Sequence, residues 1–347
     1  MPARILSAAS LSAWSGALLE AAGLEAPAAA LVADTLVEAS LRGVDSHGVA
    51  RLPIYCERLR AGLMNPRPRP RVERETGAVA SVDGDHGPGQ VAAVLAMERS
   101  VALAREHGVG AVTVHRSGHY GAAAYYVMRP ARLGFVALSM TNAEPFVAAH
   151  GGRGWSLGTN PIAFSAPRAD GELTLDMATS QVAANRVHNA RDEDQAIPAG
   201  WAIDAAGQPT TDPHRAHAML PLGGYKGYGL AVMVEVLCGA LAGAGMTHGI
   251  GRMYDEFDRG QDVGHFHLAL DPERTVGRDR LAALVDGLAL ELQAAPTAPG
   301  ADEVLLPGEP ELRTQAVRER DGIPFPPGLW RNLTLLSESL DIAPPGD

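Results

Sequence analysis

The alternation of strand-like and helix-like segments between residues 78 and 141 constrains the fold of this chain more than any other feature. Strands are predicted at 78–83, 110–115 and 135–141, and helices at 90–107 and 122–133. Strands that alternate with helices are typical of α/β proteins, because the helices cover the faces of a sheet. The chain is therefore predicted to be an α/β protein.

The segments before this alternation are helical. Helices are predicted over 11–22 and 27–41, and a third helix is expected to open at Asp45 or Ser46. The stretch 65–71 alternates proline with asparagine or arginine. Each proline lacks a donor and restrains the residue before it, so this stretch is predicted to be an extended connector that ends the helical N-terminal part.

The second half of the chain begins with an irregular region, 151–213, that is rich in glycine and proline. It contains short β-like runs at 162–166 and 173–177. Further elements are then predicted in chain order: an apolar helix at 226–242, a strand at 265–270, a helix at 278–294 and a helical piece at 324–340. We find no internal repeat.

Charge and cysteine content argue against several classes of protein. The net charge is -11, from 29 basic and 40 acidic residues, and without a basic stripe such a chain would repel nucleic acid. Two cysteines, Cys56 and Cys238, are too few for a disulfide framework. No signal peptide is visible at 1–16, and the most hydrophobic stretch, 229–246, is interrupted by Glu235. We therefore expect a cytoplasmic protein with neither a membrane span nor a nucleic-acid partner.

The segment 45–51 combines a carboxylate, a hydroxyl, an imidazole and a guanidinium. On a helix that starts at Ser46, His47 and Arg51 would share one face. An imidazole can move a proton near neutral pH, and a guanidinium can hold a carboxylate through two hydrogen bonds. The alternative is an ordinary helix cap followed by an exposed histidine and arginine.

Lysine usage gives a second indication. Lys226 is the only lysine of the chain, and it lies within a glycine-rich stretch, 223–229, at the start of a predicted helix. A compact charge at a helix start between glycines suits contact with an anion. The alternative is that one lysine remains there by chance.

The stretch 117–121 follows a predicted strand and contains His119. Ligands of α/β proteins bind at the carboxyl ends of strands, so this is a candidate site. His115 and His119 are four residues apart, but Gly118 and the strand argue against a helical metal site. We expect no metal.

Two familiar motifs are incomplete. Ser156 lies in a Gly-x-Ser-x-Gly pattern, but glycines precede it and Thr-Asn-Pro follows it, so the strand and helix of a hydrolase nucleophile elbow are not expected. Gly-x-Gly occurs at 108–110 and 243–245 without the third glycine of the Rossmann fingerprint. A nicotinamide nucleotide would therefore have to bind in another way.

Six motifs, in this order along the chain, resemble those of the malate/L-lactate dehydrogenase family of NAD(P)-dependent oxidoreductases, which is unrelated to the Rossmann-type lactate dehydrogenases. These motifs are Arg-Gly-Val-Asp-Ser-His-Gly at 42–48, Ser-Gly-His-Tyr-Gly at 117–121, Gly-Thr-Asn-Pro at 158–161, Asp-Met-Ala-Thr-Ser at 176–180, Lys-Gly-Tyr-Gly-Leu at 226–230 and Pro-Gly-Glu-Pro at 307–310.

The resemblance implies an α/β fold of the non-Rossmann type, with a mixed sheet and helices from both chain ends packed around it. Residues 1–75 would form a helical region packed with C-terminal helices within 311–347. Residues 76–310 would form the α/β region that binds cofactor and substrate. The family also implies a homodimer.

The resemblance assigns roles around a small carboxylate substrate. His47 would give a proton to the substrate carbonyl or imine, with Ser46 and Asp176 orienting or tuning it. Arg51 would hold the substrate carboxylate. His119 would line the same pocket and competes with His47 as the acid/base group.

For NAD or NADP, the resemblance points to residues of four motifs and to one asparagine. Thr159 would border both the nucleotide and the substrate. The predicted cofactor residues are Asn142, Gly158, Thr159, Asn160, Pro161, Asp176, Met177, Ala178, Thr179, Ser180, Lys226, Gly227, Gly308, Glu309 and Pro310. One departure is Ala143, which stands where many family members carry a serine.

The function implied by this resemblance is hydride transfer between a nicotinamide and C2 of a small 2-hydroxy or 2-oxo acid. Reduction of a cyclic 2-imino acid such as piperideine-2-carboxylate is the alternative. A serine hydrolase that uses Ser156 and a non-catalytic binding protein on the same fold are more distant possibilities. The sequence leaves the choice between NAD and NADP open.

Overall fold

A mixed seven-stranded sheet forms the centre of the protein, as described by a computed structural model of residues 4–346 that leaves out the side chains of residues 184, 185, 188 and 192. Its strands, in spatial order, are β2 (Arg71–Thr76), β3 (Val79–Asp83), β4 (Val109–Ser117), β13 (Val263–Leu270), β5 (Val136–Thr141), β8 (Ile162–Pro167) and β9 (Glu172–Met177). Only β3 and β4 pair in parallel, and the other neighbours are antiparallel. The predicted mixed α/β sheet is confirmed.

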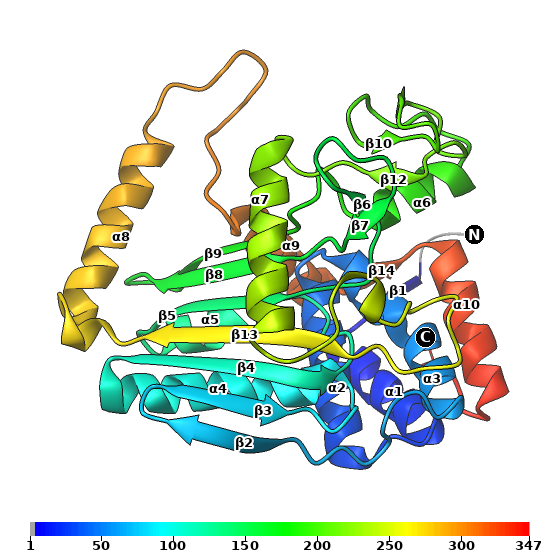
Figure 1. The fold of residues 1–347 in the computed structure, drawn as a ribbon, viewed down its shortest axis with the longest axis horizontal. Helices are drawn as coiled ribbons and strands as arrows, with labels where there is room; N and C mark the ends of the chain where they lie inside the picture. The colour runs from blue at the N-terminus through cyan, green and yellow to red at the C-terminus, as the bar shows by residue number, and fades with distance from the viewer. Residues whose placement is uncertain (1–3, 347) are drawn as a thin grey trace.

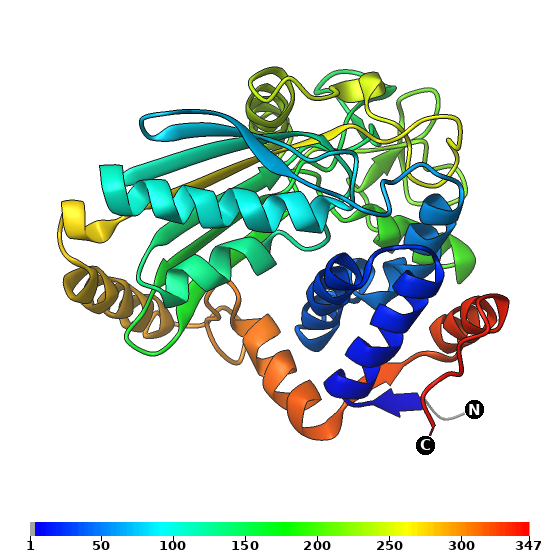
Figure 2. The same ribbon diagram turned by 90° about the horizontal axis from the view of Figure 1, so that it is seen from below.

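Helices cover both faces of this sheet (Figures 1 and 2). On one face, α4 (Gly89–His107) packs on β4 and β13, and α5 (Ala124–Arg132) packs on β5 and β8. On the other face lies α7 (Tyr225–Val234), which continues into the π-helical turn η3 (Glu235–Ala240) against β13. The helix predicted over 226–242 is thus confirmed, with a wider turn in its second half.

Both ends of the chain meet in a helical cluster at the edge of the sheet (Figure 2). The cluster contains α1 (Ala8–Ala21), α2 (Ala26–Leu41), α3 (Leu52–Arg60), α9 (Glu309–Asp321) and α10 (Pro327–Ser339). Strand β1 (Arg4–Leu6) pairs with β14 (Ile323–Phe325), and the indole of Trp14 donates to Ser337 Oγ at 2.9 Å. Helices from both chain ends are therefore packed together, as the resemblance implied.

The remaining elements lie outside these two parts. A small five-stranded sheet has the order β11 (Pro209–Thr210), β10 (Ala202–Ile203), β12 (Ala218–Met219), β6 (Val147–Ala148) and β7 (Trp155–Leu157), and α6 (Ala184–Asp192) lies beside it (Figure 1). Helix α8 (Arg278–Gln293) stands at the edge of the molecule, and a long loop leads from it to α9. Two single turns are 3-10 helical, η4 (Thr247–Gly249) and η5 (Pro272–Arg274).

The prediction that a helix begins at Asp45 or Ser46 is wrong. The chain instead forms two 3-10 turns, η1 (Asp45–His47) and η2 (Val49–Arg51), and α3 begins only at Leu52. Gly48 between the turns is extended, with φ -86° and ψ -151°, and a Cβ on it would lie 2.1 Å from Ser40 Oγ. His47 and Arg51 therefore do not share one helix face.

Elements that the sequence did not predict include β1, β2, β14, α6, α9 and the five short strands of the small sheet. The six residues of β2 are all exposed, so its strand lacks the alternation of apolar residues that reveals a half-buried strand. None of the described helices is long and apolar enough to span a membrane.

Candidate active site

A cavity of about 1010 Å³ lies between the helical cluster and the sheet. Its wall includes the turns η1 and η2, the residues that follow β4 and β5, the end of β9, and the segment 305–308 before α9. The carboxyl ends of three strands thus open into it, which is where α/β proteins place their ligands.

Two histidine rings lie stacked on the wall of this cavity. The centroids of His47 and His119 are 5.6 Å apart and their planes differ by 17°. His47 Nδ1 lies 2.9 Å from Ser46 Oγ. The two turns therefore bring His47 beside His119 without the helix that the sequence suggested.

The His119 ring is held from behind by a chain of hydrogen bonds. The amide of Gln90 donates to the Tyr55 hydroxyl at 3.0 Å, and this hydroxyl lies 2.6 Å from His119 Nδ1. The backbone N–H of Gly121 also points at Nδ1, at 3.3 Å. Because Nδ1 faces an N–H and a hydroxyl, it is the acceptor, and the proton of the neutral ring lies on Nε2.

Both imidazoles are neutral near pH 7 in the free protein. The protein around His47 excludes water and, together with the charge of Arg51, lowers its pKa to about 3. The pKa of His119 is also lowered well below its ordinary value, first by burial and then by Arg51 and His47.

Arg51 is a buried guanidinium without a carboxylate partner within salt-bridge distance among the described residues. It is 8% exposed, its Nε donates to the Ser46 carbonyl at 2.7 Å, and its guanidinium carbon lies 5.6 Å from the centre of the Tyr254 ring. Burial lowers its pKa, and Tyr55 and Glu144 oppose that shift. A buried cation of this kind on a cavity wall is suited to bind an anion.

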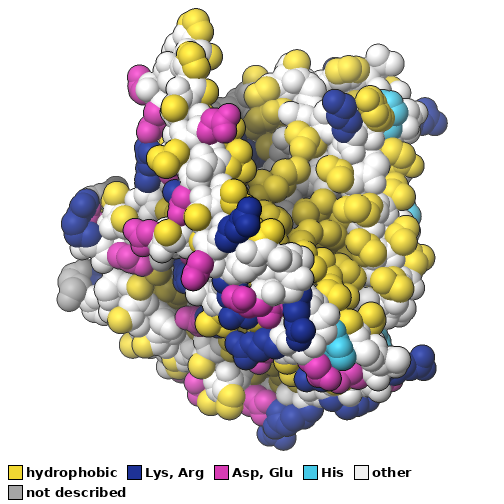
Figure 3. Space-filling view, turned by 90° about the vertical axis from the view of Figure 1, so that its left-hand side faces the viewer, with side chains coloured by type: hydrophobic (Ala, Val, Ile, Leu, Met, Phe, Trp, Pro, Cys, Tyr) yellow, Lys and Arg dark blue, Asp and Glu magenta, His cyan; other side chains and the backbone are white. Residues whose placement is uncertain are grey.

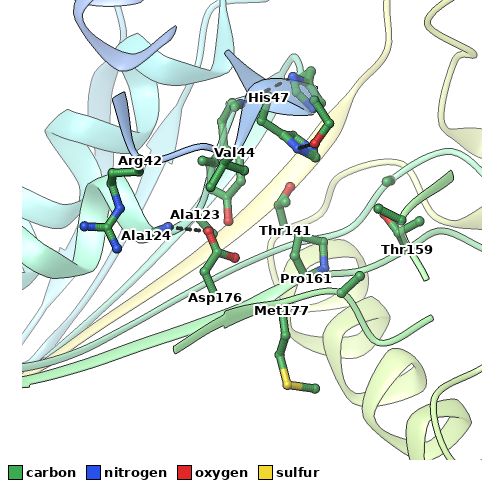
Figure 4. A pocket seen from close by; sticks show the side chains of 18 of the residues that line it. Arg42, Val44, His47, Ala123, Ala124, Thr141, Thr159, Pro161, Asp176 and Met177 are labelled. Carbon is green, nitrogen blue, oxygen red and sulfur yellow. Dashed lines mark hydrogen bonds between the residues drawn. The ribbon is translucent and has the colours of Figure 1, made fainter. Parts of the chain in front are cut away.

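Asp176 lies on the same wall but serves another element. Its Oδ2 accepts from the backbone N–H of Ala124, the first residue of α5, at 2.8 Å (Figure 4). Although the side chain is open to the cavity, surrounding protein displaces enough water to raise the pKa of Asp176 to about 6, and the Ala124 N–H and Arg42 oppose this.

The expectation that Asp176 orients His47 is not supported. No hydrogen bond joins the two side chains in the described structure. Ser46, the other residue expected to orient His47, does contact it.

The residues predicted to bind the cofactor divide into two groups. The structure brings one group together on the cavity wall: Asn142, Thr159, Pro161, Asp176, Met177, Ala178, Gly308 and Pro310. The other group does not line the cavity: Gly158, Asn160, Thr179, Ser180, Lys226, Gly227 and Glu309.

Several residues of the second group support the wall from behind. Asn160 is fully buried, accepts from the Ala143 N–H at 3.1 Å, and donates to Glu235 at 3.1 Å. Glu235 also accepts from Asn142 at 3.3 Å. The Thr179 hydroxyl donates to the Thr159 carbonyl at 3.0 Å. These side chains fix Asn142 and Thr159, so the motif residues hold the wall in shape.

Lys226, which was predicted to contact the cofactor, does not line the cavity. It is exposed at the start of α7, and no hydrogen bond or ion pair to another described residue involves its ammonium group. Glu309 is likewise occupied elsewhere, because it accepts from the Leu306 N–H and pairs with Arg313.

Sequence reasoning assigned no role to four residues near this site. Tyr55 lies behind His119, and three others line the cavity: Arg42, Glu144 and Gln261. The spacing of Tyr55 from Arg51 was a usable signal, because four residues make one helical turn. No local signal marks Gln261, which reaches the site because β13 is inserted between β4 and β5.

The cavity fits a nicotinamide nucleotide together with a small acid. Its volume is at the upper end of ordinary ligand pockets. Gly308 has φ +84°, and a Cβ there would lie 2.5 Å from the Thr174 carbonyl, so backbone approaches closely at this wall. Two buried donors on the wall, Arg42 Nε and Gln261 Nε2, have no described partner.

A family model of malate/L-lactate dehydrogenase matches residues 6–334. The chain belongs to the malate/L-lactate dehydrogenase family. It is 38% identical over 313 residues to ureidoglycolate dehydrogenase (NAD(+)) of Escherichia coli K12, covering 90% of both chains. It is 35% identical over 327 residues to L-sulfolactate dehydrogenase of Methanocaldococcus jannaschii, covering 94% of both.

Solved structures of the family share the fold. The sulfolactate dehydrogenase of M. jannaschii superimposes with a TM-score of 0.91 at 34% identity, covering 98% of both chains. The Δ1-piperideine-2-carboxylate reductase of Pseudomonas syringae superimposes with a TM-score of 0.85 at 30% identity, covering 96% of this chain and 99% of that one. The recognition made from the six motifs is confirmed.

The hydrolase alternative finds no support at Ser156. This serine lies in β7 of the small sheet, not on a turn between a strand and a helix, and its hydroxyl donates to the Gly154 carbonyl at 3.3 Å. Within the described part of the chain, no three histidine, cysteine, aspartate or glutamate side chains converge so as to hold a metal ion.

Proposed function

We propose that this protein transfers a hydride between a nicotinamide nucleotide and C2 of a small 2-hydroxy or 2-oxo acid. The observation that carries the proposal is the buried, unpaired guanidinium of Arg51 beside two neutral imidazoles on one cavity wall. Relatives that act on ureidoglycolate, malate, sulfolactate and lactate support the same reaction class.

Arg51 holds the carboxylate of the acid in this proposal. Its Nε is fixed by the Ser46 carbonyl, and its two terminal nitrogens make no hydrogen bond to a described residue. These nitrogens can take a carboxylate through two parallel hydrogen bonds, which orients C2 as well as binding the charge.

His47 moves the proton at the oxygen on C2. Its neutral ring, with Nδ1 bonded to Ser46 Oγ, leaves Nε2 free to accept the hydroxyl proton during oxidation. When the negative carboxylate pairs with Arg51, the charge that disfavours an imidazolium is offset, so His47 can hold the proton for the reverse reaction. His119, with its proton on Nε2, donates a hydrogen bond to the same oxygen.

The nucleotide is bound by the wall residues already named, with Thr159 and Gly308 at its border. Bound there, NAD supplies or accepts the hydride at C2. We propose NAD as the cofactor because a relative of 38% identity is named for NAD(+), and NADP is the alternative. The buried free thiols of Cys56 and Cys238 support a reducing, cytoplasmic location.

We further propose a homodimer, formed through the face that carries α7 and α8. Leu284, Leu288 and Leu290 on α8 are 51–67% exposed, and Val236 and Leu241 beyond α7 are 52% and 62% exposed. Figure 3 shows hydrophobic side chains gathered in and around a hollow on this side of the molecule. Apolar surface of this kind on a monomer marks an interaction site.

The reaction class is tested by absorbance at 340 nm. NADH and NADPH are supplied in parallel with pyruvate, oxaloacetate, 2-oxoglutarate, diketogulonate and piperideine-2-carboxylate, and NAD(+) is supplied with ureidoglycolate, L-malate and L-lactate. Turnover of at least one hydroxy or oxo acid is expected. Turnover of piperideine-2-carboxylate alone would favour imine reduction. The proposal would be contradicted if no acid were turned over and neither nucleotide changed the melting temperature.

A further inference from the structure

An arch formed by residues 250–262 closes one end of the cavity. Arg58 in α3 is fully buried and donates to four carbonyls of this arch, those of Arg252, Met253, Glu256 and Arg259, at 3.0–3.2 Å. Tyr254 of the arch lies against the guanidinium of Arg51. The arch therefore borders the place where the acid's carboxylate binds.

Glu144 is a buried carboxylate at the same end of the cavity. It follows β5, is 6% exposed, and its Oε1 accepts from the Met253 N–H of the arch at 3.3 Å. Burial raises its pKa, while backbone N–H groups and the charges of Arg51 and Arg58 oppose this shift. No cation lies within salt-bridge distance of Glu144 in the described structure, and no described side chain donates to its carboxylate. The carboxylate can therefore accept further hydrogen bonds from a ligand.

Gln261, at the end of the arch, presents the complementary group. It is 4% exposed and lines the cavity, and its Oε1 accepts from the backbone N–H of His119 at 3.1 Å. Its Nε2 is buried without a described partner. A buried N–H without an acceptor is costly, so a ligand carbonyl at this wall would be favoured.

We infer that Glu144 and Gln261 select a 2-hydroxy acid whose substituent on C2 carries N–H donors and a carbonyl, a ureido or amide group. This inference rests on the proposed function and names its substrate class. With the acid's carboxylate on Arg51, the N–H groups of the substituent donate to Glu144, and its carbonyl accepts from Gln261.

Two other substituents fit this end of the cavity less well. A second carboxylate, as in malate, would face the charge of Glu144, and like charges brought together without water repel strongly. A methyl group, as in lactate, would leave both Glu144 and Gln261 without partners. A site built to hydrogen-bond a substrate group discriminates strongly against an analogue that lacks it.

The inference is tested by kcat/KM with NAD(+) and three probes: ureidoglycolate, L-malate and L-lactate. Wild type is expected to prefer ureidoglycolate over L-malate by about 100-fold or more.

Glu144→Gln keeps an acceptor for the Met253 N–H and removes the charge. It should lower kcat/KM for ureidoglycolate and raise it for L-malate, each by about tenfold. Gln261→Glu keeps the acceptor for His119 and removes the N–H donors, so it should lower kcat/KM for ureidoglycolate by about tenfold or more.

Glu98→Gln is the matched control, because Glu98 is exposed on α4 outside the cavity and its loss removes the same charge. Glu98→Gln should leave kcat/KM for ureidoglycolate and kcat/KM for L-malate unchanged. NADH binding and the melting temperature check that each variant is folded. Preference of wild type for L-malate or L-lactate, or an unchanged ratio in folded Glu144→Gln, would overturn the inference while leaving the proposed function intact. Failure of every acid would instead contradict the proposed function.

Discussion

At the scale of single residues, the stacked pair of His47 and His119 concentrates the chemistry of the cavity. Two imidazoles 5.6 Å apart beside Arg51 cannot both be protonated at low cost, since each charge raises the free energy of the other. Their hydrogen bonds also differ. His119 Nδ1 accepts from its neighbours, whereas the one described hydrogen bond of the His47 ring joins it to the hydroxyl of Ser46. This difference favours His47 as the group that exchanges a proton.

His47→Ala is expected to lower kcat by about 10²- to 10⁴-fold, because a positioned general acid or base contributes that much to the rate. The affinity for NADH, measured by fluorescence titration, should stay the same. The control is His115→Ala, since His115 does not line the cavity. Full activity of His47→Ala, with a loss of that size in His119→Ala, would transfer the proton-exchange role to His119.

His267, a fully buried histidine that does not line the cavity, is expected to affect stability. His267 on β13 is fully buried, neither ring nitrogen has a described hydrogen-bond partner, and burial lowers its pKa from 6.5 to about 3. As pH falls below 6.5, the unfolded chain takes up the proton first, so the free energy of unfolding decreases between pH 6.5 and pH 3.

His267→Phe is expected to raise the melting temperature, and more so at pH 5 than at pH 8. A ring remains to pack edge-on against Tyr126, and a buried group without partners is removed. At pH 5 the substitution should add about 2 kcal/mol to the free energy of unfolding beyond its effect at pH 8. Thermal unfolding at the two pH values measures this. His150→Phe, at an exposed histidine, is the control, and an equal gain at both pH values would contradict the assigned shift.

At the scale of elements, the arch 250–262 depends on one side chain of another element. Arg58 donates to four carbonyls of the arch, and its hydrogen bond to the Met253 carbonyl is fully buried. Because Tyr254 of the same arch lies against Arg51, we expect the order of the arch to be coupled to the proposed site of the acid.

Arg58→Met is expected to lower the free energy of unfolding by about 3 kcal/mol, since four carbonyls of the arch lose the same buried donor group. Hydrogen exchange should quicken across 250–262, and KM for the acid should rise by about tenfold while NADH affinity is retained. Arg60→Met, at an exposed position of the same helix, provides the comparison. If exchange in the arch is unaltered in Arg58→Met, Arg58 does not hold it.

At the scale of the whole molecule, the exposed apolar face of α7 and α8 predicts how two chains associate. Light scattering after gel filtration is expected to give twice the 36.3 kDa chain mass. The double variant Leu284→Asp and Leu288→Asp should shift this mass to that of a monomer, because burying the new charges in the interface is costly. Leu335→Asp, at a leucine of α10 that is 57% exposed, should leave the dimer intact. A wild-type monomer, or a dimer that persists in the double variant, would rule out this interface.

Much of the fold follows from local sequence. The alternation at 78–141 predicted β3, α4, β4, α5 and β5, because strand and helix periodicity depend on residues close together in the chain. The six motifs identified the family, and the segments 45–51 and 117–121 singled out His47, Arg51 and His119, which the structure brings to one cavity wall. The division into 1–75 with 311–347 and 76–310 stays a prediction.

Only the tertiary structure decided which residues meet in the cavity. Gly48 packs against Ser40, and 3-10 turns stand where a helix was predicted at His47. Asp176 caps α5 instead of orienting His47, and Glu144 and Gln261 approach the site from segments far apart in sequence. Contacts of this kind depend on how the strands are ordered and how closely elements pack. A sequence read locally specifies many of the elements, but not which elements become neighbours.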